Sequence, residues 1–115
     1  MVLYQIVWST KALSDLAECV QFVLNVSVEA ANNLRNEAFS AANGLEAFPE
    51  KNPIFEMPKS FPFIVRKQIV SKRYALLYTI EKDKIVIYRM LVGIHQLFYL
   101  STSIKKCTFL WKLVK

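Results

Sequence analysis

The sequence IVRKQIVSKRYALLYTIEKDKIVIYRMLV, residues 64–92, decides the fold of this chain. With the phenylalanine before it, the stretch contains three β-rich runs, 63–70, 73–81 and 84–92, separated by short polar turns. Turns of this length join neighbouring antiparallel strands. The stretch therefore predicts a three-stranded antiparallel meander.

Basic residues are interspersed among the apolar residues of this meander. Arg66, Lys67 and Arg89 lie within predicted strands. A charge inside a strand costs free energy unless it meets water or a partner. Side chains alternate between the two faces of a strand, so Arg66 and Gln68 share one face while Lys67 points to the other. We expect one face of the sheet to bind something acidic.

The residues before the meander predict a strand, 2–8, followed by a helix. Ser9 or Thr10 is placed to cap this helix. Asp15 and Glu18 are expected on its solvent side. Apolar residues at three- and four-residue steps mark its buried face. They are Leu13, Leu16, Ala17, Val20, Val23 and Leu24.

A second helix follows directly. Ser27 is placed to cap it, Glu29 lies in its first turn, where the helix dipole favours an anion, and Pro49 ends it. Residues 49–62 hold all four prolines and predict a loop, with two of its residues, Phe55 and Met57, packed on the core. The alanine-rich apolar face of the helix lets it approach its neighbour closely. This face consists of Ala31, Leu34, Ala38, Ala41, Ala42, Leu45 and Phe48.

The order of these elements predicts an α+β domain. A short connection between the helices makes them an antiparallel hairpin. The first strand and the meander form a four-stranded sheet, with the helices on one face. We expect residues 1–100 to form this domain and residues 101–115 to be a C-terminal extension.

Charge is divided unevenly along the chain. Residues 1–58 hold three basic and seven acidic side chains, whereas residues 59–115 hold twelve basic and two acidic ones. Such a division predicts a basic face suited to nucleic acid or to an acidic protein. For the lysines near the C-terminus, a solvated surface is the favoured interpretation. Apolar residues make up 54 % of the chain and the mean hydropathy is +0.26, which favours an apolar groove that a partner covers.

Several kinds of chemistry find no support in the sequence. Two glycines do not make a phosphate-binding loop, and one histidine with two distant cysteines, Cys19 and Cys107, does not make a usual zinc site. We therefore expect no metal and no cofactor.

The N-terminus lacks the basic start of a signal peptide, and the apolar run 85–100 is interrupted by Arg89 and His95. We expect a cytoplasmic protein without a membrane partner.

Six segments in the order described resemble the RelE/ParE superfamily of bacterial type II toxin–antitoxin toxins, over about residues 3–97. In the first segment, Ser9, Ala12, Asp15 and Leu16 fit the family pattern S-x-x-A-x-x-D-L at the start of a helix. The segments are IVWSTKALSDL at 6–16, EAA at 29–31, LEAFP at 45–49, VRKQIV at 65–70, RYALLY at 73–78 and IYRMLVG at 87–93.

The resemblance implies a toxin that inhibits growth until a cognate acidic antitoxin neutralises it, and it allows a homodimer. RelE-like members cut mRNA on the ribosome, ParE-like members inhibit DNA gyrase without hydrolysis, and some have no known activity. For a nuclease, the resemblance implies Arg66 and Arg73 as phosphate anchors, His95 as base or acid, and Tyr99 as a stacking or proton-handling group. Such a reaction needs a base, an acid and cations around the phosphorane.

This chain departs from the nuclease pattern at two positions. Ala75 replaces the arginine of the family's Y-R-x-x-Y strand, and Gln68 replaces a second basic residue. These departures favour a ParE-like toxin, with an endoribonuclease or an inactive, antitoxin-binding protein as alternatives. The candidate binding residues are Arg66, Lys67, Lys72, Arg73, Arg89, His95 and Tyr99.

Purely structural roles are the competing interpretation for some of these residues. A lone histidine such as His95 is more often a surface or core residue than a catalyst. Arg89 is placed to pair with a helix carboxylate, Glu37 or Glu46. Three tyrosines at strand spacing are expected to pack in the core or across strands. They are Tyr74, Tyr78 and Tyr88.

Overall fold

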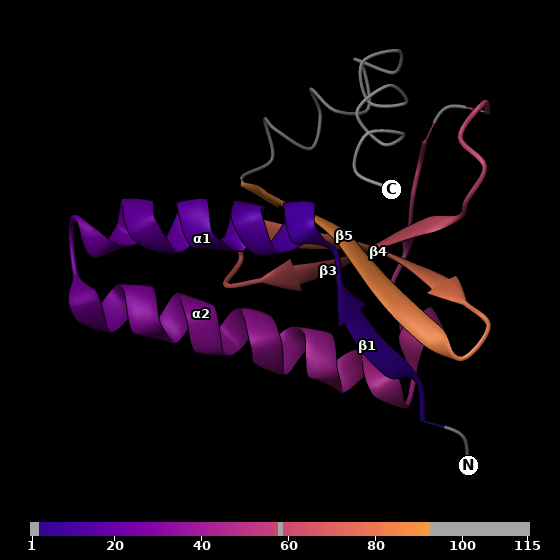
Figure 1. Cartoon of the computed structure of the whole chain (residues 1–115), viewed down its shortest axis with the longest axis horizontal. Helices are drawn as coiled ribbons and strands as arrows, with labels where there is room; N and C mark the ends of the chain where they lie inside the picture. Colours follow the sequence, from indigo (N-terminus) through magenta and orange to yellow (C-terminus); the bar gives the residue numbers. More distant parts are fainter. Residues whose placement is uncertain (1–2, 58, 93–115) are drawn as a thin grey trace.

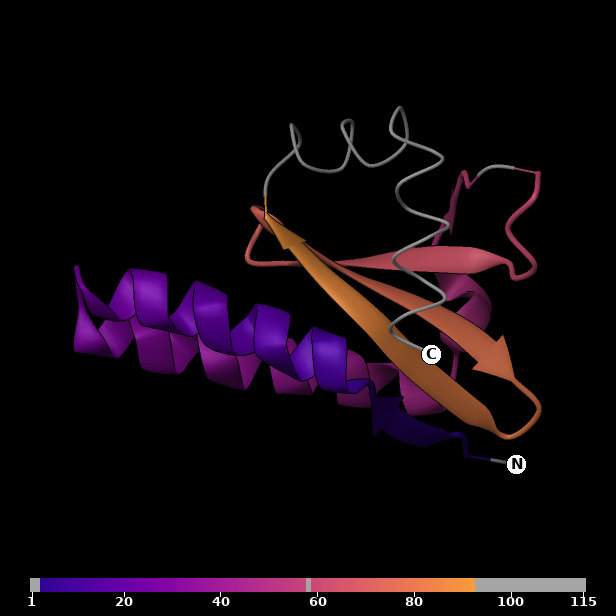
Figure 2. The same cartoon turned by 45° about the horizontal axis from the view of Figure 1, so that its top comes forward.

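The computed structural model describes residues 3–57 and 59–92, and the predicted site residues His95 and Tyr99 lie outside this part of the chain. Helices α1 and α2 lie side by side on one face of a twisted sheet (Figure 1; Figure 2). The elements in order are β1 (Gln5–Trp8), α1 (Thr10–Leu24), α2 (Val28–Asn43), the 3₁₀ helices η1 (Gly44–Glu46) and η2 (Pro49–Lys51), β2 (Ile54–Phe55), β3 (Val65–Val70), β4 (Tyr74–Glu81) and β5 (Lys84–Val92).

The sheet has five strands in the order β1-β5-β4-β3-β2. Strand β1 is parallel to β5, and the other neighbours are antiparallel. The α+β class, the helical hairpin and the meander are therefore confirmed, while the expected number of four strands is wrong. The additional strand, β2, is two residues long and follows Pro53. Strands are recognised in a sequence by the alternation of apolar and polar residues, and two residues in a proline-rich segment are too few to show it.

The main core fills the space between the helices and the sheet. Small residues at the contact, Ala12, Ala38 and Ala42, have no exposed surface, which allows the helices to approach the sheet closely. Leu34 and Leu45 of the predicted α2 face are also buried, whereas Phe48 is exposed because the helix ends at Asn43. The alanine-rich face is thus confirmed except at its last residue.

A smaller apolar cluster covers part of the other face of the sheet. Phe55 is buried and Met57 packs beside it, as predicted for the proline-rich segment. This segment therefore crosses the face that the helices leave open. The buried residues of the cluster are Phe55, Phe61, Val65, Leu77 and Leu91.

Both helices begin with the predicted serine cap. Ser9 Oγ accepts a hydrogen bond from the Ala12 N–H at 3.0 Å and donates one to the Tyr88 carbonyl at 3.0 Å. Ser27 Oγ accepts from the Ala30 N–H at 3.1 Å. Each cap satisfies a backbone donor that has no partner within its helix. Ser9 in addition ties the start of α1 to strand β5.

Asp15 is buried against β5, and its predicted place on the solvent side of α1 is wrong. Its Oδ2 accepts hydrogen bonds from the Met90 N–H at 3.0 Å and from Arg89 Nε at 2.7 Å, while its Oδ1 lies 3.2 Å from Lys11 Nζ. Strand β1 pairs with β5 only as far as Ile87. Beyond Ile87, helix α1 lies beside β5 in place of a strand. There the Asp15 carboxylate accepts the hydrogen bond that the carbonyl of a neighbouring strand would otherwise accept.

The same geometry corrects the predicted partner of Arg89. Arg89 pairs with Asp15, not with Glu37 or Glu46. The register between β4 and β5 shifts between Leu77 and Tyr78, so β5 is irregular beside Arg89. Helical periodicity cannot show this pairing, because it depends on where α1 crosses the edge of the sheet.

Removing the Asp15 carboxylate should destabilise the protein strongly. We expect Asp15→Ala to lower the free energy of unfolding by about 3 kcal/mol, because it leaves a buried N–H without an acceptor and Arg89 without its ion-pair partner. Asp15→Asn keeps an acceptor and should cost less. Urea unfolding measures both values.

Glu18→Ala is the matched control, since Glu18 is an exposed carboxylate on the same helix. It should change the free energy of unfolding by less than about 0.5 kcal/mol. An Asp15→Ala protein as stable as the Glu18→Ala protein would contradict the role assigned to Asp15.

Candidate functional site

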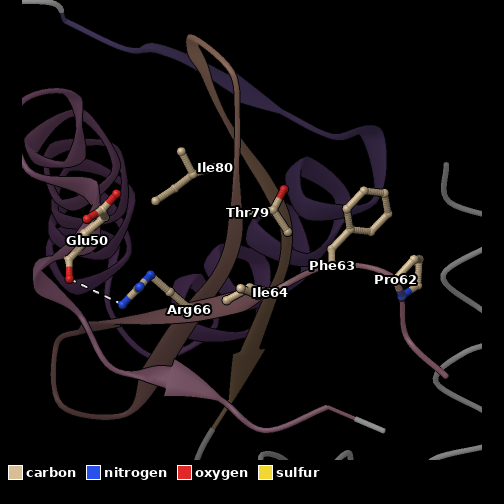
Figure 3. A pocket seen from close by; sticks show the side chains of 7 residues that line it. All are labelled: Glu50, Pro62, Phe63, Ile64, Arg66, Thr79 and Ile80. Carbon is tan, nitrogen blue, oxygen red and sulfur yellow. Dashed lines mark hydrogen bonds between the residues drawn. The ribbon is translucent and has the colours of Figure 1, made fainter. Parts of the chain in front are cut away.

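A cleft of about 440 Å³ opens beside the start of β3 and the end of β4 (Figure 3). Its walls are mostly apolar, and two of its side chains carry opposite charges, Arg66 and Glu50. The cleft is lined by Glu50, Pro62, Phe63, Ile64, Arg66, Thr79 and Ile80. It is a candidate binding site, because a charged group stands among apolar walls.

Arg66 is held at this cleft by backbone carbonyls. Its Nη1 donates to the Asn52 carbonyl at 2.7 Å and to the Glu50 carbonyl at 3.3 Å, the second of which Figure 3 marks. Among the described residues, no carboxylate lies within ion-pair distance of its guanidinium. Carbonyl dipoles orient the side chain without cancelling its charge. Arg66 can therefore still bind an anion.

A partly buried network of hydrogen bonds fixes the loop that provides these carbonyls. The Tyr78 hydroxyl donates to the Pro49 carbonyl at 2.6 Å and accepts from Asn52 Nδ2 at 3.2 Å. Asn52 Nδ2 also donates to Gln68 Oε1 at 2.8 Å. Burial raises the pKa of Tyr78, although the hydrogen bond from Asn52 and the nearby charge of Arg66 oppose this. Tyr78 therefore remains a neutral donor that holds the loop in place.

The expected packing roles of the tyrosines are confirmed. Tyr78 and Tyr88 are buried and Tyr74 is partly buried. The sequence does not predict the partners of the Tyr78 hydroxyl, nor that Asn52 and Glu50 contribute to the site. A buried tyrosine does signal that its hydroxyl needs a partner. The path of the proline-rich loop decides which residue provides it.

A second hollow, a groove of about 370 Å³, lies between α1 and the end of the sheet where β4 begins and β5 ends. Arg73 reaches it from the turn before β4. Phe22, which is 75 % exposed, stands on its helical side. The groove is lined by Glu18, Cys19, Phe22, Arg73, Tyr74 and Val92.

The other candidate cations are spread over the molecule. Arg66 pairs with Tyr78 in the register of the sheet, whereas Arg73 directly precedes Tyr74. Four residues of strand separate these positions by about 13 Å. Arg66 and Arg73 therefore line two different hollows. Arg89 is paired with Asp15.

Lys67 alternates with Arg66 along β3 and therefore points to the opposite face of the sheet. Lys72 is exposed in the turn after β3, at a φ of 64°. Ala75, which stands where the family pattern has an arginine, is fully buried. The described residues thus bring no two of the predicted cations together in one cleft.

Arginine among apolar walls is suited to recognition of an anionic group. Within the described ranges, no cluster of histidine, cysteine or acidic residues could hold a metal ion. No helix in that part of the chain is both long and apolar enough to cross a membrane.

Comparisons with known proteins agree with this architecture. Residues 6–95 match the family described as the ParE toxin of type II toxin–antitoxin system, parDE. A solved structure from the chromosomal ParDE TA system of P. aeruginosa is similar to this chain with a TM-score of 0.62 and 17 % sequence identity. The match covers 79 % of this chain and 97 % of that one. No curated protein sequence matches this chain.

The Cys19 thiol should react slowly. Burial, followed by the nearby carboxylates of Asp15 and Glu18, raises the pKa of Cys19 to about 11. At pH 8 only about one thiol in a thousand is then ionised, and the thiolate is the reactive form. We expect alkylation by iodoacetamide to be at least about a hundredfold slower than for an unperturbed cysteine of the same exposure.

The measurement needs the Cys107→Ser variant, so that only one thiol reacts. Urea-unfolded protein is the control and should react at the ordinary rate. A Cys19 that is alkylated equally fast in the folded and unfolded states at pH 8 would refute the assignment.

Proposed function

Since the chain belongs to the family of ParE toxins of type II toxin–antitoxin systems, we propose that it inhibits DNA gyrase by binding, without hydrolysing its target. An acidic antitoxin neutralises it, and both act in the cytoplasm. The binding residue that we assign first is Arg66, whose charge is oriented but not neutralised. Its apolar surroundings strengthen its attraction for a carboxylate or a phosphate.

The observation that carries the proposal is the separation of the arginines. A nuclease needs several cations around one phosphorane, together with a base and an acid. Arg66 and Arg73 line different hollows, and Arg89 is bound to Asp15. This arrangement favours recognition over cleavage. The endoribonuclease alternative would depend on His95 and Tyr99.

The antitoxin is expected to carry acidic and large apolar side chains. The acidic ones complement the basic second half of the chain. The apolar ones match large side chains that are exposed on this molecule, among them Phe22 and Ile64. Copurification of the two chains after co-expression tests the partnership, and a toxin that elutes as a free monomer would count against it.

Gyrase inhibition gives a direct test of the target. Folded, antitoxin-free protein should inhibit supercoiling of relaxed plasmid DNA by gyrase. Primer extension on cellular mRNA after induction should show no codon-phased cuts. Cuts that His95→Ala abolishes would establish the endoribonuclease instead, and absence of both effects would indicate an inactive toxin-like protein.

Arg66→Ala should weaken supercoiling inhibition at least about tenfold, because a charge-assisted contact contributes about 1.5 kcal/mol or more. Arg66→Lys keeps the charge but loses the planar fork, and should recover part of the effect. Thermal unfolding must accompany the assay, since the substitutions also remove hydrogen bonds to Glu50 and Asn52.

Arg35→Ala is the matched control. Arg35 is an exposed arginine on α2, where it lies over the Phe39 ring at 5.6 Å. Its replacement should leave inhibition unchanged. Equal losses in the Arg66 and Arg35 variants would show that overall charge, not the cleft, determines binding.

A further inference from the structure

The connection between α1 and α2 exposes apolar side chains at the end of the helical hairpin. Both helices extend past the sheet, so this end of the hairpin projects from the rest of the fold (Figure 1; Figure 2). Val26 is 83 % exposed, Val28 is 64 % exposed and Leu24 is 41 % exposed. We call these three residues the hairpin tip. Apolar side chains exposed together on a projecting element are typical of a surface that a partner covers.

Backbone hydrogen bonds hold the hairpin tip in one shape. The N–H groups of Val26 and Ser27 both donate to the Val23 carbonyl, each at 2.9 Å. The Ser27 hydroxyl accepts from the Ala30 N–H and fixes the start of α2 at Val28. Valine side chains are stiff, because they rotate about a single bond with few allowed positions. A partner that covers the tip therefore immobilises few rotating bonds, which lowers the entropic cost of binding.

The hairpin tip is separate from both hollows. None of its three residues lines the cleft of Arg66 or the groove of Arg73. Phe22 is also exposed near the end of α1, but it lines the groove and is therefore not counted in the tip. The tip offers a contact in addition to those that the two hollows provide.

The charge around the tip distinguishes between candidate partners. Residues 19–28 contain no charged side chain, and the nearest charged residues on either side are Glu18 and Glu29, both of which are exposed. No basic side chain occurs between Lys11 and Arg35. An acidic antitoxin would meet like charges here, and so would a second copy of this chain. The charge favours a partner with an apolar crevice and basic side chains at its rim.

We propose that the hairpin tip inserts into an apolar crevice with a basic rim on the target of the toxin. The inference rests on the proposed function, which identifies that target as DNA gyrase. Val26 and Val28 make the apolar contact in the crevice, and Glu18 and Glu29 lie towards its rim. The competing interpretation is that the valines are separately exposed residues without a partner, which are common on protein surfaces.

Removal of the apolar side chains tests the contact. The double variant Val26→Ser/Val28→Ser should inhibit supercoiling by gyrase at least about tenfold more weakly, because the burial of even one valine contributes about that factor to affinity. Leu13→Ser is the matched control, since Leu13 is an exposed apolar residue in the first turn of the same helix. Its inhibition should equal that of the unaltered chain. Both variants should keep the midpoint of thermal unfolding within about 4 °C, because the replaced side chains are exposed.

A charge reversal beside the tip tests the basic rim. Glu29→Lys should weaken inhibition about threefold, because it turns an attraction at the edge of the contact into a repulsion. Glu46→Lys makes the same change in net charge at an exposed acidic residue outside the hairpin tip, and it should leave inhibition unchanged. Equal losses in the two variants would show that net charge, not the tip, determines the effect.

A binding measurement separates this inference from the proposed function. The probe is an environment-sensitive fluorophore attached to the Val26→Cys variant of a Cys107→Ser protein, in which the buried Cys19 reacts slowly. Gyrase should shift the emission to shorter wavelength, because the label enters an apolar crevice. The same label on the Leu13→Cys variant should not respond.

The outcomes are distinguishable. Equal inhibition by the unaltered chain and the double serine variant would overturn the inference and leave the proposed function standing. A shift in emission without inhibition of supercoiling would refute the proposed function and leave the tip contact standing. Absence of both effects would refute both. Loss of a dimer in the serine variant with unchanged inhibition, measured by size-exclusion chromatography, would assign the tip to a second copy of this chain and overturn the inference.

Discussion

The carboxylate of Asp15 is the interaction on which the rest of the structure depends. It lies where β1 ends and β5 continues, and it accepts from the backbone of Met90 and from the side chain of Arg89. Helix α1 is thereby fixed to the edge of the sheet, and α2 follows through the short connection between the helices. An edge strand with unpaired backbone groups is a liability. Here Asp15 and Ser9 satisfy those groups without another strand.

This arrangement determines which arginines can still bind an anionic partner. Arg89 binds Asp15 and takes no part in either hollow. Arg66 is oriented by carbonyls from the proline-rich loop and keeps its charge. Arg73 stands in the turn before β4, beside the other hollow. The basic character of the second half of the chain is therefore distributed over several surfaces, which suits binding to proteins better than stabilising one phosphorane.

Much of the fold could be predicted because local patterns specify it. Alternation and short turns specified the meander, and Ser9 and Ser27 specified the helix starts. Three features depended on tertiary geometry instead. Asp15 is polar, so helical periodicity predicts that it faces solvent. In the structure it accepts a hydrogen bond from the backbone of β5 instead. The two residues of β2 were too few to show a period. The network around Tyr78 required knowledge of the loop path.

In the candidate site, Gln68 is the clearest example of a residue whose role depends on tertiary geometry. In the sequence, Gln68 departs from the nuclease pattern, because a neutral amide stands where that pattern has a basic residue. In the structure its Oε1 accepts from Asn52, which belongs to the loop that orients Arg66, and its Nε2 donates to the Ile69 carbonyl at the open edge. A basic residue has donors only and could not make both contacts. Gln68 therefore connects the edge of β3 to the loop that holds Arg66. A cation at position 68 would therefore leave the amide of Asn52 without this acceptor and loosen the loop that positions Arg66.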